Sequence, residues 1–262
     1  MEPLITFSTC WYSLKAKFPE RIYEEWMDNL LSNVKHYNLV LYTDNNRLFS
    51  SKYGENKRIC IVVKALNEFY NDRHKDFWRE NHNRNPLLNR KVEWEVNMLW
   101  AEKVHFVEET RTRLYFPKTE YYGWIDIGYF RCRPNLDTPK EKLCDFGHPD
   151  KVRKLDKDKI HVALVNSNNK YIQELSMLIQ KGFSIPSDQI SIGGGCFIGE
   201  YEKMGEWKRM FTEKMESYIT KNRLIKDDQI IMADCVFSQL SNFQIHTEKG
   251  PYDSWFLFTR VL

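Results

Sequence analysis

Short apolar runs alternate with helical spacing in the first half of the chain. Leu4–Cys10, Leu39–Tyr42 and Arg58–Val63 are runs of strand-forming residues. After Pro19, a residue favoured in a first helical turn, apolar positions recur at the spacing of one helix face. These positions are Tyr23, Trp26, Met27, Leu30 and Val34. A strand, a helix and two more strands predict an α/β fold with a mostly parallel central sheet flanked by helices.

The second half continues the pattern with three strands and three helices. The predicted strands are Tyr121–Ile127, Ile160–Val165 and Gln189–Ile198, the last interrupted by Gly193, Gly194 and Gly195, and the predicted helices are Val92–Arg113, Glu200–Lys221 and Asp227–Leu240. The polar stretch 71–91 and the charge-rich stretch 131–160 are predicted to be surface excursions. Because the chain shows no internal repeat or low-complexity linker, its 262 residues are expected to form one domain.

Composition narrows the possible functions. A hydrophobic fraction of 42% with 15% aromatic residues is sufficient for a packed core. Lys and Arg number 39 against 36 Asp and Glu, so the net charge is only +3. A domain that binds nucleic acid usually carries a clear basic excess, so we expect no nucleic-acid partner.

The sequence also suggests a cellular compartment. The N-terminal residues lack the positive region and long apolar core of a signal peptide, and no stretch is apolar enough to be a transmembrane segment. The six cysteines are scattered without a CxxC pair, which favours free thiols in a reducing compartment. A cytoplasmic location is therefore expected.

One carboxylate stands out as a candidate site. Asp126 ends the otherwise apolar strand that begins at Tyr121, and Gly128 follows shortly after. In open α/β sheets ligands bind beyond the carboxyl ends of strands, where the strand order switches. A hard divalent cation that holds substrate phosphates needs one or two such carboxylates. The alternative is that Asp126 is an ordinary turn or helix-capping residue.

Two segments carry a family resemblance. Trp124–Arg131, preceded by Met98–Lys103, resembles the bacterial HtrL/YibB-type family, which in turn resembles the GT-A glycosyltransferases. The resemblance implies a GT-A-like fold, a nucleotide-diphosphate-sugar donor, UDP-linked in the first instance, and a carbohydrate-containing acceptor. It also implies a divalent metal, Mn²⁺ or Mg²⁺, on a D-x-D-like motif at Asp126. Gly128 stands where many such enzymes have the second Asp.

Further candidates surround this motif. Lys103 lies in the middle of an apolar helical stripe, so it either reaches a diphosphate at the helix edge or pairs with a structural acid. The ends of the first two strands resemble the nucleotide-holding edges of the family. They offer Thr9, Trp11, Thr43 and Asp44 for the ribose and base, although Thr and Asp also end strands as turn formers.

The last third supplies the remaining candidates. Gly194 and Gly195 fit a strand that a ligand approaches closely, or a bulge. The resemblance places a catalytic or sugar-binding acid at Asp228 or Asp227, where either residue could instead stabilise the start of a helix. It also places a late histidine, His246, on the metal with Asp126, although a lone histidine is more often structural.

Three functions remain open at this point. The leading one is a glycosyltransferase that moves a sugar from a nucleotide-diphosphate sugar to a hydroxyl of a glycan, glycolipid or glycoprotein. The second is another metal-dependent phosphate enzyme such as a nucleotidyltransferase, which would favour two or three clustered carboxylates. The third is a non-catalytic nucleotide- or carbohydrate-binding module on a transferase-like fold.

Overall fold

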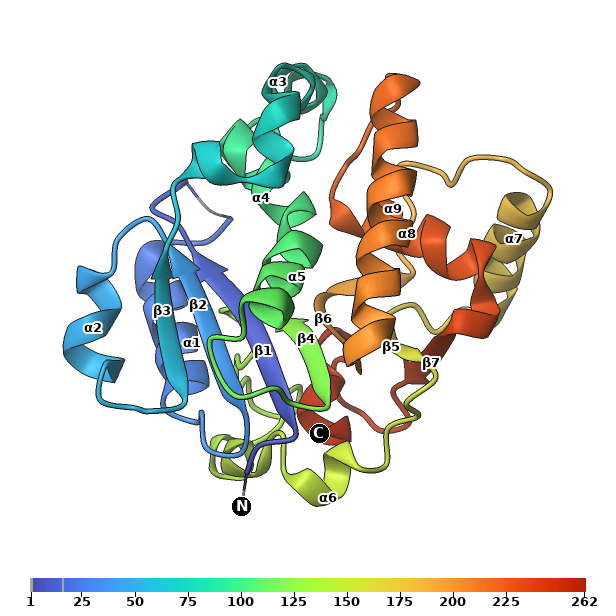
Figure 1. Ribbon diagram of the computed structural model, residues 1–262. Helices are drawn as coiled ribbons and strands as arrows, with labels where there is room; N and C mark the ends of the chain where they lie inside the picture. The colour runs from blue at the N-terminus through green and yellow to red at the C-terminus, as the bar shows by residue number, and fades with distance from the viewer. Residues whose placement is uncertain (1, 16) are drawn as a thin grey trace.

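A seven-stranded sheet forms the centre of the molecule (Figure 1). The computed structural model describes residues 2–15 and 17–262. The strands are β1 (Ile5–Trp11), β2 (Asn38–Thr43), β3 (Ile59–Val63), β4 (Tyr121–Ile125), β5 (Ile160–Leu164), β6 (Ile192–Glu200) and β7 (Phe243–Thr247). Their order is β3-β2-β1-β4-β6-β5-β7, and β6 runs antiparallel to both its neighbours. The prediction of a mostly parallel sheet flanked by helices is confirmed.

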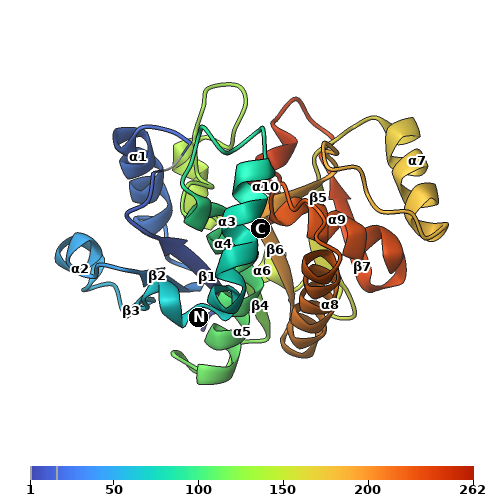
Figure 2. The same cartoon turned by 90° about the horizontal axis from the view of Figure 1, so that it is seen from above.

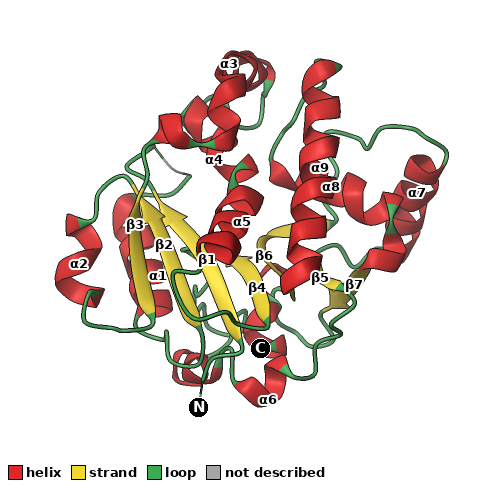
Figure 3. Ribbon diagram, in the orientation of Figure 1, coloured by secondary structure: helices red, strands yellow, loops and turns green. Residues whose placement is uncertain are grey.

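Helices cover both faces of this sheet (Figures 2 and 3). They are α1 (Glu20–Leu31), α2 (Arg47–Tyr53), α3 (Lys75–Arg84), α4 (Trp94–Ala101), α5 (Lys103–Arg113), α6 (Pro149–Val152), α7 (Asn169–Gln180), α8 (Tyr201–Thr220), α9 (Asp228–Ser238) and α10 (Phe258–Val261), with short 3₁₀ turns between them. One core packs α5, α8 and α9 against the sheet. A second core packs α1 and α10 against the opposite face.

The strand order creates a switch point beside β1. From β1 the chain proceeds outward through β2 to β3, whereas β4 pairs with the other side of β1. The loops that leave β1 and β4 therefore diverge at the carboxyl edge of the sheet. Such a divergence opens a crevice in open α/β sheets and is their usual ligand site.

The predicted helix 92–113 is divided in the structure. It forms α4 and α5, which meet at Glu102. The Glu102 carboxylate is fully buried and accepts hydrogen bonds from the backbone N–H groups of Tyr70 and Asn71 and from the Asn71 side chain. The division places Lys103 in the first turn of α5.

The two predicted surface excursions are wrong in the same way. Residues 71–91 include the whole of α3, whose Trp78 is fully buried. Residues 131–160 include a 3₁₀ turn and α6, and their Leu143 and Val152 belong to the second core. Both stretches bury single apolar residues between many charged ones, and such sparse spacing gives no amphipathic signal.

The glycine-rich strand also differs from expectation. β6 runs without interruption through Gly193, Gly194 and Gly195. The irregularity lies in its pairing with β5, where the register shifts between Val162 and Leu164.

Among the helices of residues 2–15 and 17–262, none is long and apolar enough to cross a membrane.

Candidate functional site: a lysine between two acids

A cavity of about 540 Å³ opens at the switch point between β1 and β4. Its volume lies within the range of small-molecule sites. Eight of the residues predicted from the sequence line it: Trp11, Lys103, Asp126, Gly128, Gly194, Gly195, Asp227 and Asp228. The structure thus brings together segments that lie more than two hundred residues apart in the chain.

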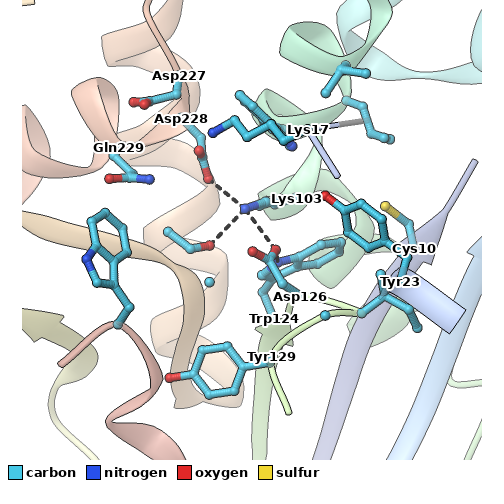
Figure 4. Close-up of a pocket in the computed structure, with 18 of the residues that line it drawn as sticks. Cys10, Lys17, Tyr23, Lys103, Trp124, Asp126, Tyr129, Asp227, Asp228 and Gln229 are labelled. Atoms are coloured by element: carbon cyan, nitrogen blue, oxygen red, sulfur yellow. Dashed lines mark hydrogen bonds and ion pairs between the residues drawn. The ribbon is translucent and has the colours of Figure 1, made fainter. Parts of the chain in front are cut away.

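Lys103 is the centre of the site (Figure 4). Its ammonium lies 2.9 Å from Asp126 Oδ1 and 3.0 Å from Asp228 Oδ2, and it donates a hydrogen bond of 2.9 Å to the carbonyl of Gly194. The Lys103 side chain is only 7% exposed. Three oxygens, from the residue after β4, from β6 and from α9, therefore surround one ammonium group, which has three protons to give.

Opposing electrostatic effects act on the charge of Lys103. Lys103 occupies the first turn of α5, where the helix dipole opposes a positive charge. Burial alone would lower the pKa of Lys103, but the charges of Asp126 and Asp228 outweigh burial and raise it. Lys103 is thus held as a cation by the two acids.

The two oxygens of Asp126 differ in their surroundings. Oδ1 accepts a 2.7 Å hydrogen bond from the indole N–H of Trp124 and also pairs with Lys103. The Asp126 side chain is 42% exposed. Its backbone N–H donates a hydrogen bond to the carbonyl of Gly195. Asp126 is therefore anchored through Oδ1 and presents Oδ2 to the cavity.

The two acids of α9 do not act as helix caps. Asp227 occupies the capping position, but its side chain makes no capping hydrogen bond, and Asp228 pairs with Lys103 instead. Asp227 is only 8% exposed, yet its Oδ1 is buried without a hydrogen-bond partner among the described residues. Buried polar atoms are normally paired, so this oxygen has capacity left for a ligand.

Burial also changes the acidity of this pair. It raises the pKa of Asp228 to about 6, although the nearby Lys103 opposes the shift. It raises the pKa of Asp227 as well. Carboxyl groups with raised pKa values in a cleft are candidates for proton transfer near neutral pH.

The glycines of β6 make room for this cluster. A Cβ on Gly194 would lie 2.7 Å from Asp228 Oδ2, and a Cβ on Gly195 would lie 3.1 Å from the Tyr129 ring. The sequence suggested that a ligand approaches these glycines. In the structure, side chains of the site itself fill the space beside them.

Gly128 has a separate explanation. A Cβ at this position would lie 3.0 Å from Cε3 of Trp26 in α1. The position is therefore packed against a helix on the second face of the sheet. A second Asp here, as in a D-x-D motif, would require the Trp26 ring to shift by a few tenths of an ångström.

Four predicted residues do not line the cavity. Thr9 is fully buried within β1. The Thr43 hydroxyl donates to the carbonyl of Asn45 and accepts from its backbone N–H. Asp44 accepts a hydrogen bond from the backbone N–H of Ser13 and so connects two loops. Thr43 and Asp44 make the contacts of turn formers, which was the structural alternative for them.

His246 is the fourth of these residues. It lies on β7, three strand spacings or about 14 Å across the sheet from β4, the strand that Asp126 follows. Its Nε2 lies 2.9 Å from Nδ1 of His161. The predicted pairing of His246 with Asp126 on one metal is not formed.

Three buried asparagines were missed by sequence reasoning. Asn81 of α3 exchanges two 2.8 Å hydrogen bonds with the backbone of Ile225, and Asn97 also donates to the Ile225 carbonyl. Asn85 donates to the carbonyl of Lys226. These bonds fix the two residues that precede Asp227. For Asn81 and Asn85, the one available signal is the repeated asparagine within residues 71–91.

Two cations at the cavity were also missed. Lys17 follows β1, and Arg131 follows β4. The Lys17 ammonium lies 4.5 Å from the ring centre of Trp100, and the Arg131 guanidinium lies 4.2 Å from that of Trp26. Trp11 packs on Tyr23 beside them, at 5.0 Å between ring centres. The cavity thus has an aromatic wall that carries positive charge.

The fit of a metal ion can be judged from these contacts. Among residues 2–15 and 17–262, no three His, Cys, Asp or Glu side chains form a group that could hold a metal ion. Asp126 offers one unpaired oxygen, beside the ammonium of Lys103. The donor set therefore does not fit a dedicated metal site.

Comparison with known proteins identifies the family. The family described as "Bacterial protein of unknown function (HtrL_YibB)" matches residues 15–261. The chain belongs to this family. The resemblance to HtrL/YibB proteins seen in the sequence is thereby confirmed. No curated protein matches the chain.

Proposed function

We propose that this HtrL/YibB family member is a GT-A-like glycosyltransferase that uses a nucleotide-diphosphate sugar, UDP-linked in the first instance. The observation that carries the proposal is the cavity at the switch point, with Asp126, Lys103 and Asp228 joined at its base. The mostly parallel sheet flanked by helices is the layout that the GT-A resemblance implies. The acceptor is a hydroxyl of a carbohydrate-containing molecule.

The lining suits the parts of such a donor. Trp11 and Tyr23 supply an aromatic wall on which a base can stack. Asp126 Oδ2 and Asp227 Oδ1, which have no hydrogen-bond partner among the described residues, offer acceptors for sugar hydroxyls in the same cavity. A site of mixed aromatic and carboxylate character fits a nucleotide sugar better than a purely apolar ligand.

The chemistry requires one proton acceptor. The oxygen of the acceptor hydroxyl forms a bond to the anomeric carbon, and the bond from that carbon to the diphosphate oxygen breaks. The nucleoside diphosphate departs with the electron pair, and the hydroxyl proton passes to a carboxylate. Asp227 and Asp228 are suited to this role because burial raises the pKa of both side chains.

Ligand stabilisation provides the first test. UDP and other nucleoside diphosphates should raise the melting temperature of the protein. A ligand that binds only the native state stabilises it by about 2.7 kcal/mol at a hundredfold excess over its Kd. No shift with any nucleoside diphosphate at saturating concentrations would contradict the proposal.

Product analysis provides the second test. A panel of nucleotide sugars is incubated with the protein, and the released compounds are separated. Slow release of nucleoside diphosphate, lost in Asp227→Asn or Asp228→Asn, is the expected result. Release of pyrophosphate would instead indicate a nucleotidyltransferase. Binding without turnover by any donor and acceptor would indicate a binding module.

A further inference from the structure

The cavity contains two cations that form no ion pair with an acid among the described residues. Five cationic side chains line it, and three of them pair with carboxylates, namely Lys103, Arg133 and Lys226. Lys17 and Arg131 form no ion pair with any described carboxylate. Both lie instead on aromatic rings, which hold a cation in place without neutralising its charge.

These two side chains come from the loops that frame the switch point. Lys17 lies in the segment between β1 and α1, and Arg131 lies just beyond β4. Arg131 is enclosed by the rings of Trp26 and Phe256, and its Nε donates to the carbonyl of Gly128 at 3.4 Å. Burial lowers the pKa of Arg131, and the nearby charge of Arg133 adds to this shift. An anion at Arg131 would relieve both effects.

The usual place for a metal ion is already filled by protein groups. Lys103 holds one oxygen of Asp126 and one of Asp228, and the position of a second acid is taken by Gly128, where a side chain would crowd the Trp26 ring. A divalent ion on the remaining oxygen of Asp126 would be repelled by the Lys103 ammonium on the same carboxylate. One of the negative charges of this acid pair is thus already balanced by a cation of the chain.

We propose that Lys17 and Arg131 hold the diphosphate of the donor, so that donor binding needs no divalent metal ion. This assignment rests on the proposed function and adds the residues and the charge source to it. A diphosphate carries at least two negative charges, which an ammonium and a guanidinium can meet directly through charge-assisted hydrogen bonds. Loss of the leaving diphosphate is then assisted by these two side chains.

The test uses isothermal titration calorimetry with three probes: inorganic pyrophosphate, UDP and uridine. The protein is titrated in excess EDTA and again with added Mg²⁺ or Mn²⁺. Pyrophosphate and UDP should bind in EDTA with affinities within about threefold of those in metal. Lys17→Met and Arg131→Gln should each weaken both ligands by about tenfold to a hundredfold and leave uridine unchanged.

Matched variants control for charge and folding. Lys170→Met removes an exposed lysine of α7 outside the cavity and should bind all probes normally. Arg131→Lys keeps the charge and should retain part of the affinity that Arg131→Gln loses. Lys17 is exposed, so its variant should melt like the wild type and remains informative if Arg131→Gln misfolds.

The outcomes separate this inference from the proposed function. If UDP binds only with metal, or if both variants bind pyrophosphate and UDP normally, the cation assignment is wrong while the transferase proposal stands. If pyrophosphate binds as expected and no nucleoside diphosphate does, the anion site stands and the donor assignment fails. If neither ligand binds in any condition, both are wrong.

Discussion

One cluster of titratable side chains at the switch point and another between β5 and β7 use their bonding capacity differently. At the switch point, Lys103 joins two acids, while Oδ2 of Asp126 and Oδ1 of Asp227 have no hydrogen-bond partner among the described residues. Between β5 and β7, His161 and His246 bond each other, and Phe258 packs against the His246 ring.

The histidine pair leaves little capacity for a ligand. Nε2 of His161 lies 2.9 Å from the carbonyl of Asp156, so this nitrogen must donate. Nδ1 of His161 is then the acceptor for the N–H of His246 Nε2. Burial of a titratable group is therefore a weak sign of a ligand site. Unused capacity that faces a cavity is a stronger one.

The largest expected effect comes from removing the cation of the first cluster. Lys103→Met leaves two buried or half-buried acids without their common partner. Loss of one member of a buried ion pair typically costs about 3–5 kcal/mol of unfolding free energy. Urea denaturation measures this loss. Adding Asp228→Asn to Lys103→Met should restore part of the stability, because the two changes share one interaction. A loss below about 1 kcal/mol would show that the cluster is well solvated.

The histidine pair predicts a dependence of stability on pH. Burial lowers the pKa of His246 to about 4, and the neighbouring His161 adds to this. The unfolded state then binds more protons than the native state between about pH 6.5 and pH 4. Stability is therefore full above pH 6.5 and falls as the pH drops towards 4, by up to about 3 kcal/mol for this group.

The His246→Gln variant isolates that contribution. The Gln amide can still donate to His161, so the native contact is retained. Carboxylates elsewhere also titrate in this range, so the relevant quantity is the difference in unfolding free energy between wild type and variant at each pH. If the two curves run parallel from pH 7 to pH 4, His246 is solvated and contributes nothing to acid sensitivity.

The sequence could predict features that depend on local pattern. The apolar runs locate β1, β2 and β3, and Asp126 was found because a carboxylate follows a buried strand. Spacing along the chain determines such features. Local pattern or the family resemblance also indicates most residues at the centre of the site, including Lys103 and Asp228.

The rest depends on partners far away in the chain. Asn81 bonds Ile225, 144 residues later, and nothing near Asn81 reveals this contact. Gly128 is explained by Trp26, and the position of His246 by the placement of β7 beside β5. Neither strand order nor helix packing can be deduced from periodicity. The acids that pair with Lys103 cannot be deduced from periodicity either, because they come from distant segments of the chain.

The asparagine contacts should have an intermediate effect. Asn81→Ala removes two buried hydrogen bonds and leaves the Ile225 N–H without its partner. The expected loss is about 1–3 kcal/mol of unfolding free energy. Donor turnover, measured at a temperature at which the variant is still folded, should also fall, because the backbone before Asp227 is no longer fixed. Asn83→Ala, an exposed neighbour in α3, is the matched control and should change neither quantity.

The smallest effect on stability is expected at Asp227. Its Oδ1 has no partner, and its Oδ2 lies 3.7 Å from Lys226, so Asp227→Asn breaks little and should change the unfolding free energy by less than about 1 kcal/mol. Asp228→Asn loses the Lys103 ion pair and should cost more. Turnover should be lost in whichever variant lacks the proton acceptor, because the reaction needs one such carboxylate. A comparison of melting curves and donor turnover for the two neighbours therefore separates structure from chemistry. If Asp227→Asn destabilises the protein as much as Asp228→Asn while donor turnover stays normal, the unpaired oxygen of Asp227 belongs to the framework of α9, and Asp228 alone would carry the proton.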